Sequence, residues 1–393
     1  MKKKIVFWCP FFGKVGTANA VIESVKALNE SKKFHCKVMN VFGEFDEYSD
    51  FFSKNNIEEI KLTNCKFVNY TPKKGFFWSR LNYLFIVLIS FIPLICYLKK
   101  NPRDIFFTYL LNSLPFFVIK FFNFKNKIVF RISGKINYTF LRKIIFKYAR
   151  KKIFKVFIQT KFAKKNLIKQ EIFDKKKISF LGDPIIDIKK INKLKRNKIE
   201  NKFAKKPFYI AIGRLTRQKN FSFLIESISE IMKSKKFNLL ILGDGEQKKF
   251  LNQIVRKKKL QKRIFLLGYK KNIYGYLNKS KGLICTSLWE EPGFIIQEAA
   301  ACKKIILTSN CESGPSEFLN NGRDGYIFLS NNKESFIKNF YRMIDNSKMH
   351  KIMIRKNHNK IQRYSREYFK NYLSFPTNYF KHIRSNQFSI KQI

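Results

Sequence analysis

The sequence has 393 residues, and 45% of them are hydrophobic, which is enough for a packed core in each of about two domains. Eighty Lys and Arg against 27 Asp and Glu give a net charge of +53, which favours polyanionic partners such as nucleic acid, an anionic membrane face or anionic substrates. The seven cysteines form no CxxC pair and the four histidines do not cluster, which argues against a disulfide framework and against a zinc site. We therefore expect reduced cysteines and a cytosolic protein.

Apolar strand patterns alternate with helical patterns through the first half of the chain. The expected strands are 4–9, 35–42, 104–110, 127–132, 156–159 and 178–181. The first strand runs into a turn that contains Gly13 and Gly16, and such turns often face a phosphate or substrate, although a plain tight turn has the same sequence. Arg131 ends a later strand at the same sheet edge, where it either reaches a cleft or has a structural role.

Residues 81–98, LNYLFIVLISFIPLICYL, form the longest apolar run. Its length lies at the lower limit of the roughly 17–25 residues of a membrane span, and it contains Asn82, Ser90 and Pro93. A single span would also separate the first strand from the second half of the chain. A spanning helix, a buried core helix and a helix that dips into one membrane face all remain open. Flanking basic residues favour the third, on an anionic membrane; they are Lys73, Lys74, Arg80, Lys99, Lys100 and Arg103.

The second half restarts with a strand at 207–212, followed by the loop GRLTRQKN and an amphipathic helix. Arg214 and Lys219 flank the start of that helix, where unpaired amides and a partial positive charge favour an anion. The alternative is that they are two more surface cations of a very basic protein. Further strands end at Gly243 and just before Tyr269.

Residues 282–328 repeat a strand–loop–helix unit, so that both loops and both helix starts lie at one edge of a parallel sheet. Glu290 lies in the first loop and Glu298 in the helix that follows, with seven residues between them. For an isolated pair, a solvated loop acid and a charge on a helix face would be the more common interpretation. Gly293 allows the backbone to approach a ligand closely. The second loop ends at Ser313 and Gly314.

Together these segments resemble the donor-binding motifs of the retaining glycosyltransferases of family 4, also called group 1. The resemblance is strong over residues 213–328 and weak over 1–185. It implies that Glu298 holds the ribose hydroxyls, that Glu290 lies by the sugar hydroxyls, and that Arg214 and Lys219 bind the donor diphosphate. The expected substrate-binding residues beside these are Gly13, Gly16, Arg131, Gly243, Tyr269, Gly293, Phe294, Ile295, Ser313 and Gly314. The loop Glu-Glu-Pro-Gly-Phe departs from the Glu-Gly-Phe-Gly of many members, which leaves open which backbone amides meet the sugar and the diphosphate.

The resemblance further implies the GT-B fold, with two Rossmann-like α/β domains that face a cleft. We expect an acceptor-binding domain at 1–186, a linker at 187–206, a nucleotide-sugar-binding domain at 207–349, and helices at 350–393 that pack back on the first domain. The expected activity is a retaining transfer of a sugar from a nucleoside-diphosphate sugar to a glycan or lipid-linked acceptor, without a metal or other cofactor. The expected location is the inner face of the cytoplasmic membrane, where such acceptors of cell-envelope polysaccharides are found.

Two other function classes compete with this expectation. The net charge alone suggests a nucleic-acid-binding protein, but no RNA- or DNA-binding motif is present and the basic residues are spread along the chain. A glycosidase would use Glu290 and Glu298 as acid and base, but it would leave the GRLTRQKN motif unexplained.

Overall fold

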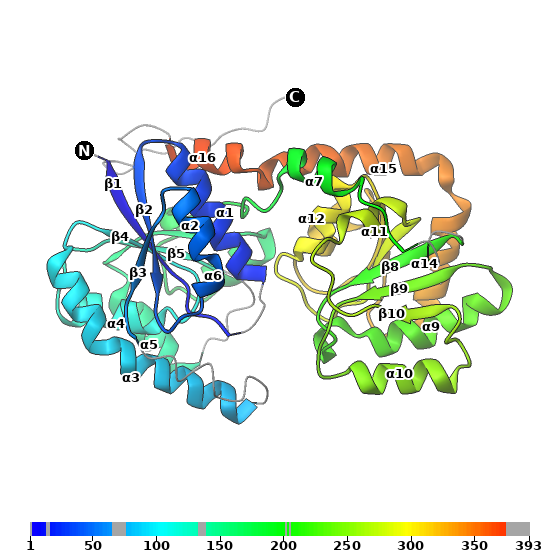
Figure 1. The fold of residues 1–393 in the computed structure, drawn as a ribbon, viewed down its shortest axis with the longest axis horizontal. Helices are drawn as coiled ribbons and strands as arrows, with labels where there is room; N and C mark the ends of the chain where they lie inside the picture. Colours follow the sequence, from blue (N-terminus) through cyan, green and yellow to red (C-terminus); the bar gives the residue numbers. More distant parts are fainter. Residues whose placement is uncertain are drawn as a thin grey trace.

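The computed structural model describes residues 2–12, 16–64, 76–132, 139–200, 203 and 206–374. Figure 1 shows two α/β domains side by side, joined along one edge by α7 and by the α15–α16 region. The described strands form two parallel sheets, one in each domain.

The first domain is built on a sheet with the strand order β3-β2-β1-β4-β5-β6-β7. Its strands are β1 (Lys3–Trp8), β2 (Phe34–Asn40), β3 (Glu58–Lys61), β4 (Ile105–Thr108), β5 (Ile128–Arg131), β6 (Ile153–Ile158) and β7 (Ile178–Phe180). Because successive strand residues point to opposite faces, Val6 and Trp8 lie in one hydrophobic core and Ile5 and Phe7 in a second. Both faces of the sheet are therefore buried.

Helices cover both faces of this sheet. They are α1 (Gly16–Glu30), α2 (Ser49–Lys54), α3 (Phe76–Lys100), α4 (Ser113–Phe121), α5 (Phe140–Ala149) and α6 (Lys161–Lys169), with short turns η1 (Asp46–Tyr48) and η3 (Lys175–Lys177). The Thr139 and Thr160 hydroxyls cap the first turns of α5 and α6 by accepting backbone N–H bonds. Because the strands run parallel, these two helices, which follow β5 and β6, start at the carboxyl edge of the sheet.

The second domain has the strand order β10-β9-β8-β11-β12-β13. Its strands are β8 (Phe208–Ile212), β9 (Asn238–Leu242), β10 (Ile264–Leu266), β11 (Gly282–Cys285), β12 (Ile305–Ser309) and β13 (Tyr326–Phe328). Its helices are α9 (Phe221–Ser234), α10 (Lys248–Lys257), α11 (Tyr274–Lys279), α12 (Phe294–Ala301), α13 (Pro315–Phe318) and α14 (Lys333–Asp345), with η4 (Arg217–Lys219) and η5 (Asn320–Gly322). The strand order reverses between β8 and β11, and the crevice in which open α/β sheets bind ligands is expected outside the ends of these two strands.

The segment expected as a linker contains a helix, α7 (Ile188–Leu194), whose Ile191 is buried. The chain returns to the first domain near its end. Helix α15 (Ser347–Lys360) still belongs to the second domain, because Asn357 donates to the Asp324 carbonyl at 2.6 Å and Lys360 pairs with the Asp324 carboxylate. The crossing follows in η6 (Ile361–Tyr364), later than residue 350.

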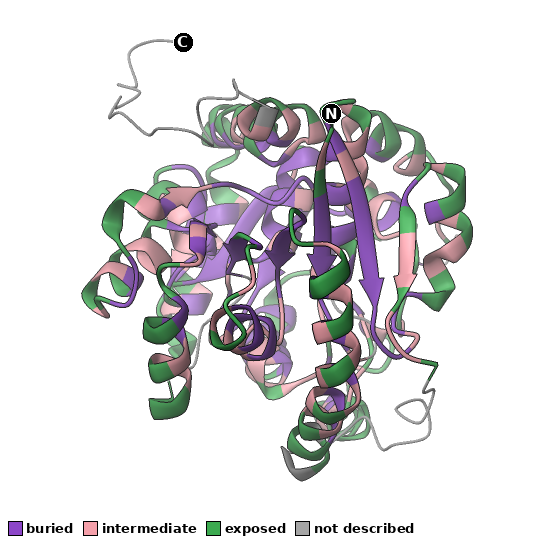
Figure 2. Cartoon of the chain, turned by 90° about the vertical axis from the view of Figure 1, so that its left-hand side faces the viewer, coloured by how far each residue is buried: buried purple, intermediate pink, exposed green. Residues whose placement is uncertain are grey.

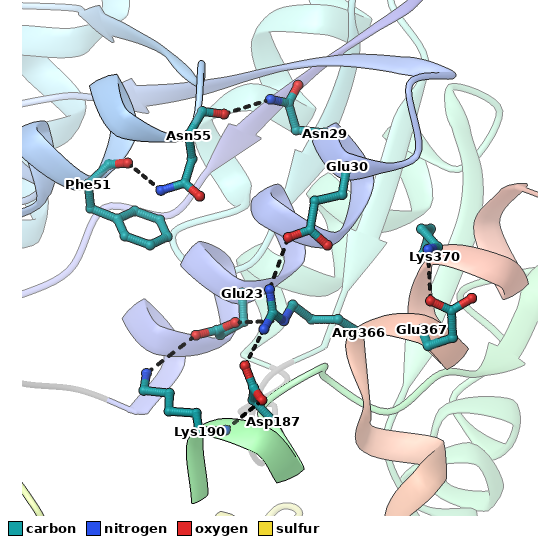
Figure 3. Close-up of polar contacts among 10 residues, drawn as sticks. All are labelled: Glu23, Asn29, Glu30, Phe51, Asn55, Asp187, Lys190, Arg366, Glu367 and Lys370. Atoms are coloured by element: carbon teal, nitrogen blue, oxygen red, sulfur yellow. Dashed lines mark hydrogen bonds and ion pairs between the residues drawn. The ribbon is translucent and has the colours of Figure 1, made fainter. Parts of the chain in front are cut away.

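The last described helix, α16 (Arg366–Ser374), packs on α1 of the first domain. Its Phe369 is fully buried in the first-domain core. Figure 3 shows Arg366 between carboxylates of α1 and of the linker: it bonds to Glu30 at 3.0 Å, lies 3.4 Å from Glu23, and pairs with Asp187. This network ties the end of the chain, the linker and the first domain together.

Helix α3 has two different faces. Ile86, Ser90 and Leu94 are buried in the first-domain core, whereas Leu88 and Ile92 are 65% and 68% exposed. Figure 2 shows exposed and half-buried residues along the outer side of this helix. By length and composition, Arg80–Lys100 is the one helix among the described residues that is apolar enough to cross a membrane, and 28% of its most apolar window is buried. The structure thus combines a core-packed face with an exposed apolar face.

Candidate active site

The predicted donor loops meet at the carboxyl edge of the second sheet. Hydrogen bonds to backbone carbonyls join the loop after β8 to the loop after β11: the Thr286 hydroxyl donates to the Lys219 carbonyl at 2.9 Å, and the Leu288 amide donates to the Gln218 carbonyl at 2.8 Å. The loop after β9 is equally close, because a Cβ on Gly243 would lie 1.8 Å from the Gly213 carbonyl oxygen. Only glycine fits at this position.

Lys219 and Glu290 form an ion pair in this crevice. The Ser287 hydroxyl also donates to the Glu290 carboxylate, at 2.6 Å, and both Ser287 and Glu290 are buried. Arg214 precedes Lys219 in the same loop and is exposed; its carbonyl accepts a hydrogen bond from the Thr216 amide at 2.8 Å. The structure therefore brings Lys219 and Glu290 together, with Arg214 earlier in the same loop after β8.

Glu298 lies on α12, and the Tyr274 hydroxyl of α11 donates to its carboxylate at 3.0 Å. The residue keeps some exposed surface, but its carboxyl group is enclosed by protein atoms. Burial raises the pKa of this carboxyl to about 7, although the bond from Tyr274 and the charge of Lys190 pull the pKa the other way. A buried carboxylate of this kind is suited to accept hydrogen bonds from ligand hydroxyls.

The raised pKa makes the stability of the protein depend on pH in a predictable direction. From pH 4.5, the ordinary pKa of the group, up to about 7, the folded state holds a proton that the unfolded chain has lost, so the free energy of unfolding falls as the pH rises. Glu298→Gln removes this proton from the balance. We expect the variant to gain thermal stability relative to the wild type between about pH 5 and about pH 8. Melting curves that shift in parallel for the two proteins would contradict this assignment.

The two domains touch at the predicted substrate loops. A Cβ on Gly16, at the start of α1, would lie 3.3 Å from the Phe294 ring at the start of α12. Phe294 also packs against a hydrophobic core of the first domain. The Phe294 side chain therefore makes a contact between the domains. The predicted substrate-binding role of this residue would then fall to its backbone amide. Gly13, the other predicted glycine of this turn, lies outside the described residues.

A second contact between the domains was not anticipated from the sequence. The carboxylate of Glu291 accepts hydrogen bonds from the hydroxyls of Thr160, at 2.7 Å, and of Ser313. Burial raises the pKa of this carboxyl, against the bonds from the two hydroxyls. Glu317 of α13 accepts from the Lys161 amide at 2.7 Å, so a second-domain acid caps a first-domain helix. Glu291, the residue next to Glu290 in the motif, thus joins the two domains. The Ser313 hydroxyl is occupied by its hydrogen bond to Glu291.

Arg131 does not open onto the cleft. Its side chain is fully buried, and its Nε donates to Asp183 at 2.7 Å. Burial raises the pKa of the Asp183 carboxyl above its ordinary value, although the positive charge and the hydrogen bond of Arg131 oppose this rise. The structure therefore supports the structural role that the sequence left open. The partner, Asp183, follows β7 and carries no local signal of this pairing.

The remaining predicted residues lie around the same crevice. The Gly243 amide donates to the Gly268 carbonyl at 2.9 Å, which places Tyr269, 58% exposed, beside the loop after β9. A Cβ on Gly314 would lie 2.2 Å from the Pro292 carbonyl oxygen, so the two loops of the repeated unit touch. Gly293 and Ile295 lie at the start of α12. No group of three or more potential metal ligands occurs among the described residues.

With this geometry in place, the comparisons with known proteins define the class of fold. A glycosyltransferase from Rickettsia africae superposes with a TM-score of 0.73 at 20% identity, covering 95% of this chain and 97% of its own. An Anabaena protein solved with UDP and glucose, HepE, superposes with a TM-score of 0.71 at 16% identity, covering 95% of this chain and 98% of its own. The chain therefore has the GT-B fold of two Rossmann-like domains facing a cleft, as the sequence predicted.

Sequence comparison gives the narrower likeness, which lies in the second half. Residues 192–360 match the family model of the group 1 glycosyl transferases. A glycosyltransferase of Methanocaldococcus jannaschii is 32% identical over 169 residues, which are 42% of this chain and 41% of the relative. The N-acetylgalactosamine-N,N'-diacetylbacillosaminyl-diphospho-undecaprenol 4-alpha-N-acetylgalactosaminyltransferase of Campylobacter jejuni is 26% identical over 39% of this chain and 41% of its own length. The chain thus spans about two fifths of these curated relatives.

Proposed function

We propose that the protein is a glycosyltransferase that moves a sugar from a nucleoside-diphosphate sugar to a lipid-linked or glycan acceptor of the cell envelope. The observation that carries the proposal is the ion pair of Lys219 and Glu290 at the carboxyl edge of the second sheet, inside the segment that matches the group 1 family model. UDP and glucose in the structure of HepE support a nucleotide sugar as the donor class.

The crevice suits the departure of a nucleoside diphosphate. The diphosphate gains negative charge as the glycosidic bond breaks, and preorganised cations and amides that receive such charge are commonly the largest catalytic contribution. Arg214 and Lys219 would receive it, together with the amides after Gly293. Glu298 would hold the ribose hydroxyls and Glu290 would lie by the sugar hydroxyls. These roles require no divalent metal, and we expect turnover to survive added chelator.

We propose retention of the anomeric configuration, as the resemblance to family 4 implies. No side chain of the crevice is assigned as a base, because the departing phosphate oxygen can accept the acceptor's proton. An inverted product would contradict this part of the proposal while leaving the donor site intact.

Two observations support an acceptor that is attached to a membrane. The name of the Campylobacter jejuni relative contains a diphospho-undecaprenol acceptor. In this chain the exposed face of α3 carries Leu88 and Ile92, and basic residues flank the helix. We propose peripheral attachment to the inner face of the cytoplasmic membrane, by partial insertion of this face and by attraction to anionic lipids.

Vesicle flotation tests the attachment. Binding should rise with the content of anionic lipid, and Leu88→Asp with Ile92→Asp should release a folded protein, because both side chains are exposed. High salt should remove only part of the protein, since the apolar contribution persists. Equal flotation of the double variant and the wild type would exclude α3 as the attachment face.

The experiment that tests the function is a binding panel. Calorimetric titration with UDP-, GDP-, CDP- and ADP-sugars should show saturable binding of one nucleotide class. Binding of RNA or DNA with none of these nucleotide sugars would favour the alternative suggested by the charge, a nucleic-acid-binding protein. We do not favour that alternative, because the ion pair of Lys219 and Glu290 lies within the segment that matches the glycosyl transferase family model.

A further inference from the structure

The start of α6 in the first domain is bound by two carboxylates of the second domain. Glu317 of α13 accepts a hydrogen bond from the Lys161 amide at 2.7 Å, and Glu291 of the loop after β11 accepts from the Thr160 hydroxyl that caps α6. A helix start attracts negative charge because its first amides have no partner within the helix. These bonds hold the two domains together at one point, and we call Thr160, Ser313, Glu291 and Glu317 the α6 clasp.

Three side chains of the α6 clasp lie within hydrogen-bond distance of one another. Thr160 and Ser313 each bond to the Glu291 carboxylate, and their two hydroxyl oxygens are 2.9 Å apart. Each hydroxyl has one proton to donate, and the Thr160 oxygen also accepts from the Ala163 amide. When Glu291 is ionised, two protons therefore serve three contacts between oxygen atoms. One contact then joins two oxygen atoms without a proton between them.

A proton on Glu291 completes this ring of hydrogen bonds. The Glu291 carboxyl then donates to the Ser313 hydroxyl, which donates to the Thr160 hydroxyl, and Thr160 donates to the second oxygen of Glu291. Thr160 and Ser313 are buried, and a buried contact between two acceptors is costly. The protonated carboxyl therefore makes the more stable contact between the domains.

The surroundings of Glu291 also favour its protonated form. Burial raises the pKa of the Glu291 carboxyl and the charge of Glu317 adds to the rise, although the bonds from the two hydroxyls and the charge of Arg131 oppose it. The other charged groups nearby are paired or exposed: Arg131 pairs with Asp183 and Glu290 with Lys219, while the side chains of Lys161 and Glu312 are exposed.

We propose that Glu291 is a positioning residue that closes the α6 clasp by taking up a proton and loosens it when the carboxyl ionises. The clasp acts on the donor site through the chain itself, because the next residue, Glu290, pairs with Lys219. Its closure needs no substrate and goes beyond the proposed function, whereas its effect on turnover rests on that function.

The proton fixes the direction of the pH dependence. In an open clasp, where water reaches the carboxyl, Glu291 has its ordinary pKa of 4.5, and in the closed clasp this pKa is raised. The contribution of the proton to closure is therefore fully present below pH 4.5 and is lost as the pH rises through the raised pKa.

Hydrogen exchange of the Lys161 and Phe162 amides tests the clasp, because both amides donate to Glu317 across the domains. The full chain is measured without nucleotide sugar from about pH 5 to about pH 9, and each rate is divided by the intrinsic rate at that pH. Wild-type protection should fall by roughly three- to tenfold over this range, the usual effect of one lost hydrogen bond.

Glu291→Gln should keep its protection over the whole range, because the amide group donates and accepts like a protonated carboxyl. Glu291→Ala should have low protection throughout. Glu334→Gln, with the same change of charge on the exposed face of α14, is the matched control and should behave like the wild type. Because Glu44 and Glu298, with pKa values of about 7, are present in all these proteins, the difference between Glu291→Gln and wild type isolates Glu291.

Protection that falls equally in the wild type and in Glu291→Gln would overturn the proposal, and so would wild-type protection that rises with pH. Thermal melting must first show that Glu291→Gln is folded. If it is not, Ser313→Ala takes its place, because removing one oxygen from the ring should also remove the pH dependence.

A pH profile of turnover separates positioning from stability alone. With the nucleotide sugar that the protein binds, kcat of the wild type should fall at high pH while kcat of Glu291→Gln is maintained. Equal profiles would remove the positioning role. If a nucleotide sugar binds but the exchange of the two proteins changes in parallel, the clasp proposal fails and the proposed function stands. If the exchange behaves as expected but no nucleotide sugar binds, the clasp stands and the proposed function fails.

Discussion

Lys219→Ala should lower kcat by roughly 100- to 1,000-fold, the usual effect of removing one preorganised group that stabilises developing charge. In the structure Lys219 pairs with the buried Glu290, at the crevice where the donor diphosphate is proposed to leave. The loss should appear in kcat more than in KM, because the charge of the leaving group grows as the bond breaks. Steady-state kinetics with the nucleotide sugar identified by the binding panel provide the measurement.

Arg214→Ala should show a similar loss, and the double variant should lose less than the product of the two, because both cations act on one diphosphate. Arg217→Ala is the matched control, since Arg217 is exposed on the same short η4 turn. Lys219→Ala leaves the Glu290 carboxylate without its cation, so thermal melting must first show that this variant is folded. If it is unfolded, Lys219→Arg is the variant to measure, because it keeps the positive charge. Full activity of a folded Lys219→Ala variant would remove Lys219 from the mechanism.

Glu298→Gln should weaken nucleoside-diphosphate binding at least about tenfold while the fold survives. A carboxylate that receives two ribose hydroxyls makes charge-assisted hydrogen bonds of about 1.5–3 kcal/mol each, and glutamine reproduces only part of this. Since the pKa of Glu298 is about 7, wild-type affinity should also fall as the pH drops below that value, and the variant should lack this dependence.

Calorimetry with the nucleoside diphosphate across that pH range measures both effects. Glu226→Gln, on the exposed face of α9, is the control with the same change of charge and should bind like the wild type. An unchanged affinity in Glu298→Gln would show that the ribose lies elsewhere.

The fold and the position of the crevice followed from the sequence because they depend on local patterns. Buried parallel strands read as continuous apolar runs, and glycines mark the places where a strand turns tightly into a loop, as Gly243 does against Gly213. The parallel order then brings the ends of β8 and β11 to one edge, and with them Lys219 and Glu290.

The contacts between the domains could not be predicted in this way. Glu291 bonds to Thr160, which lies 131 residues earlier in the chain. The local sequence around Glu291 is that of an ordinary acidic loop, and the local sequence around Thr160 is that of an ordinary helix cap. Arg131 is similar, because its burial depends on Asp183, which only the folded sheet brings near. A pairing of this kind requires the tertiary arrangement, which periodicity does not contain.

Helix α3 illustrates a third limit. It is apolar around most of its circumference, so its sequence shows no preferred face. The packing of its neighbours decides that Ile86 and Leu94 are buried while Leu88 and Ile92 stay exposed. The sequence therefore left a spanning helix, a core helix and a membrane-dipping helix as alternatives and favoured the third. The structure shows one face packed in the core and one exposed apolar face.

Sugar transfer by the protein can be measured directly. The protein is incubated with the nucleotide sugar that it binds, labelled in the sugar, and with a lipid extract of membranes that contain phosphate-linked acceptors. We predict that the label moves into the lipid-soluble phosphate fraction and that the transfer is lost in folded Lys219→Ala but kept in Arg217→Ala. Label that remains in the nucleotide sugar, or appears only as free sugar, with every extract and with soluble glycans would contradict the account.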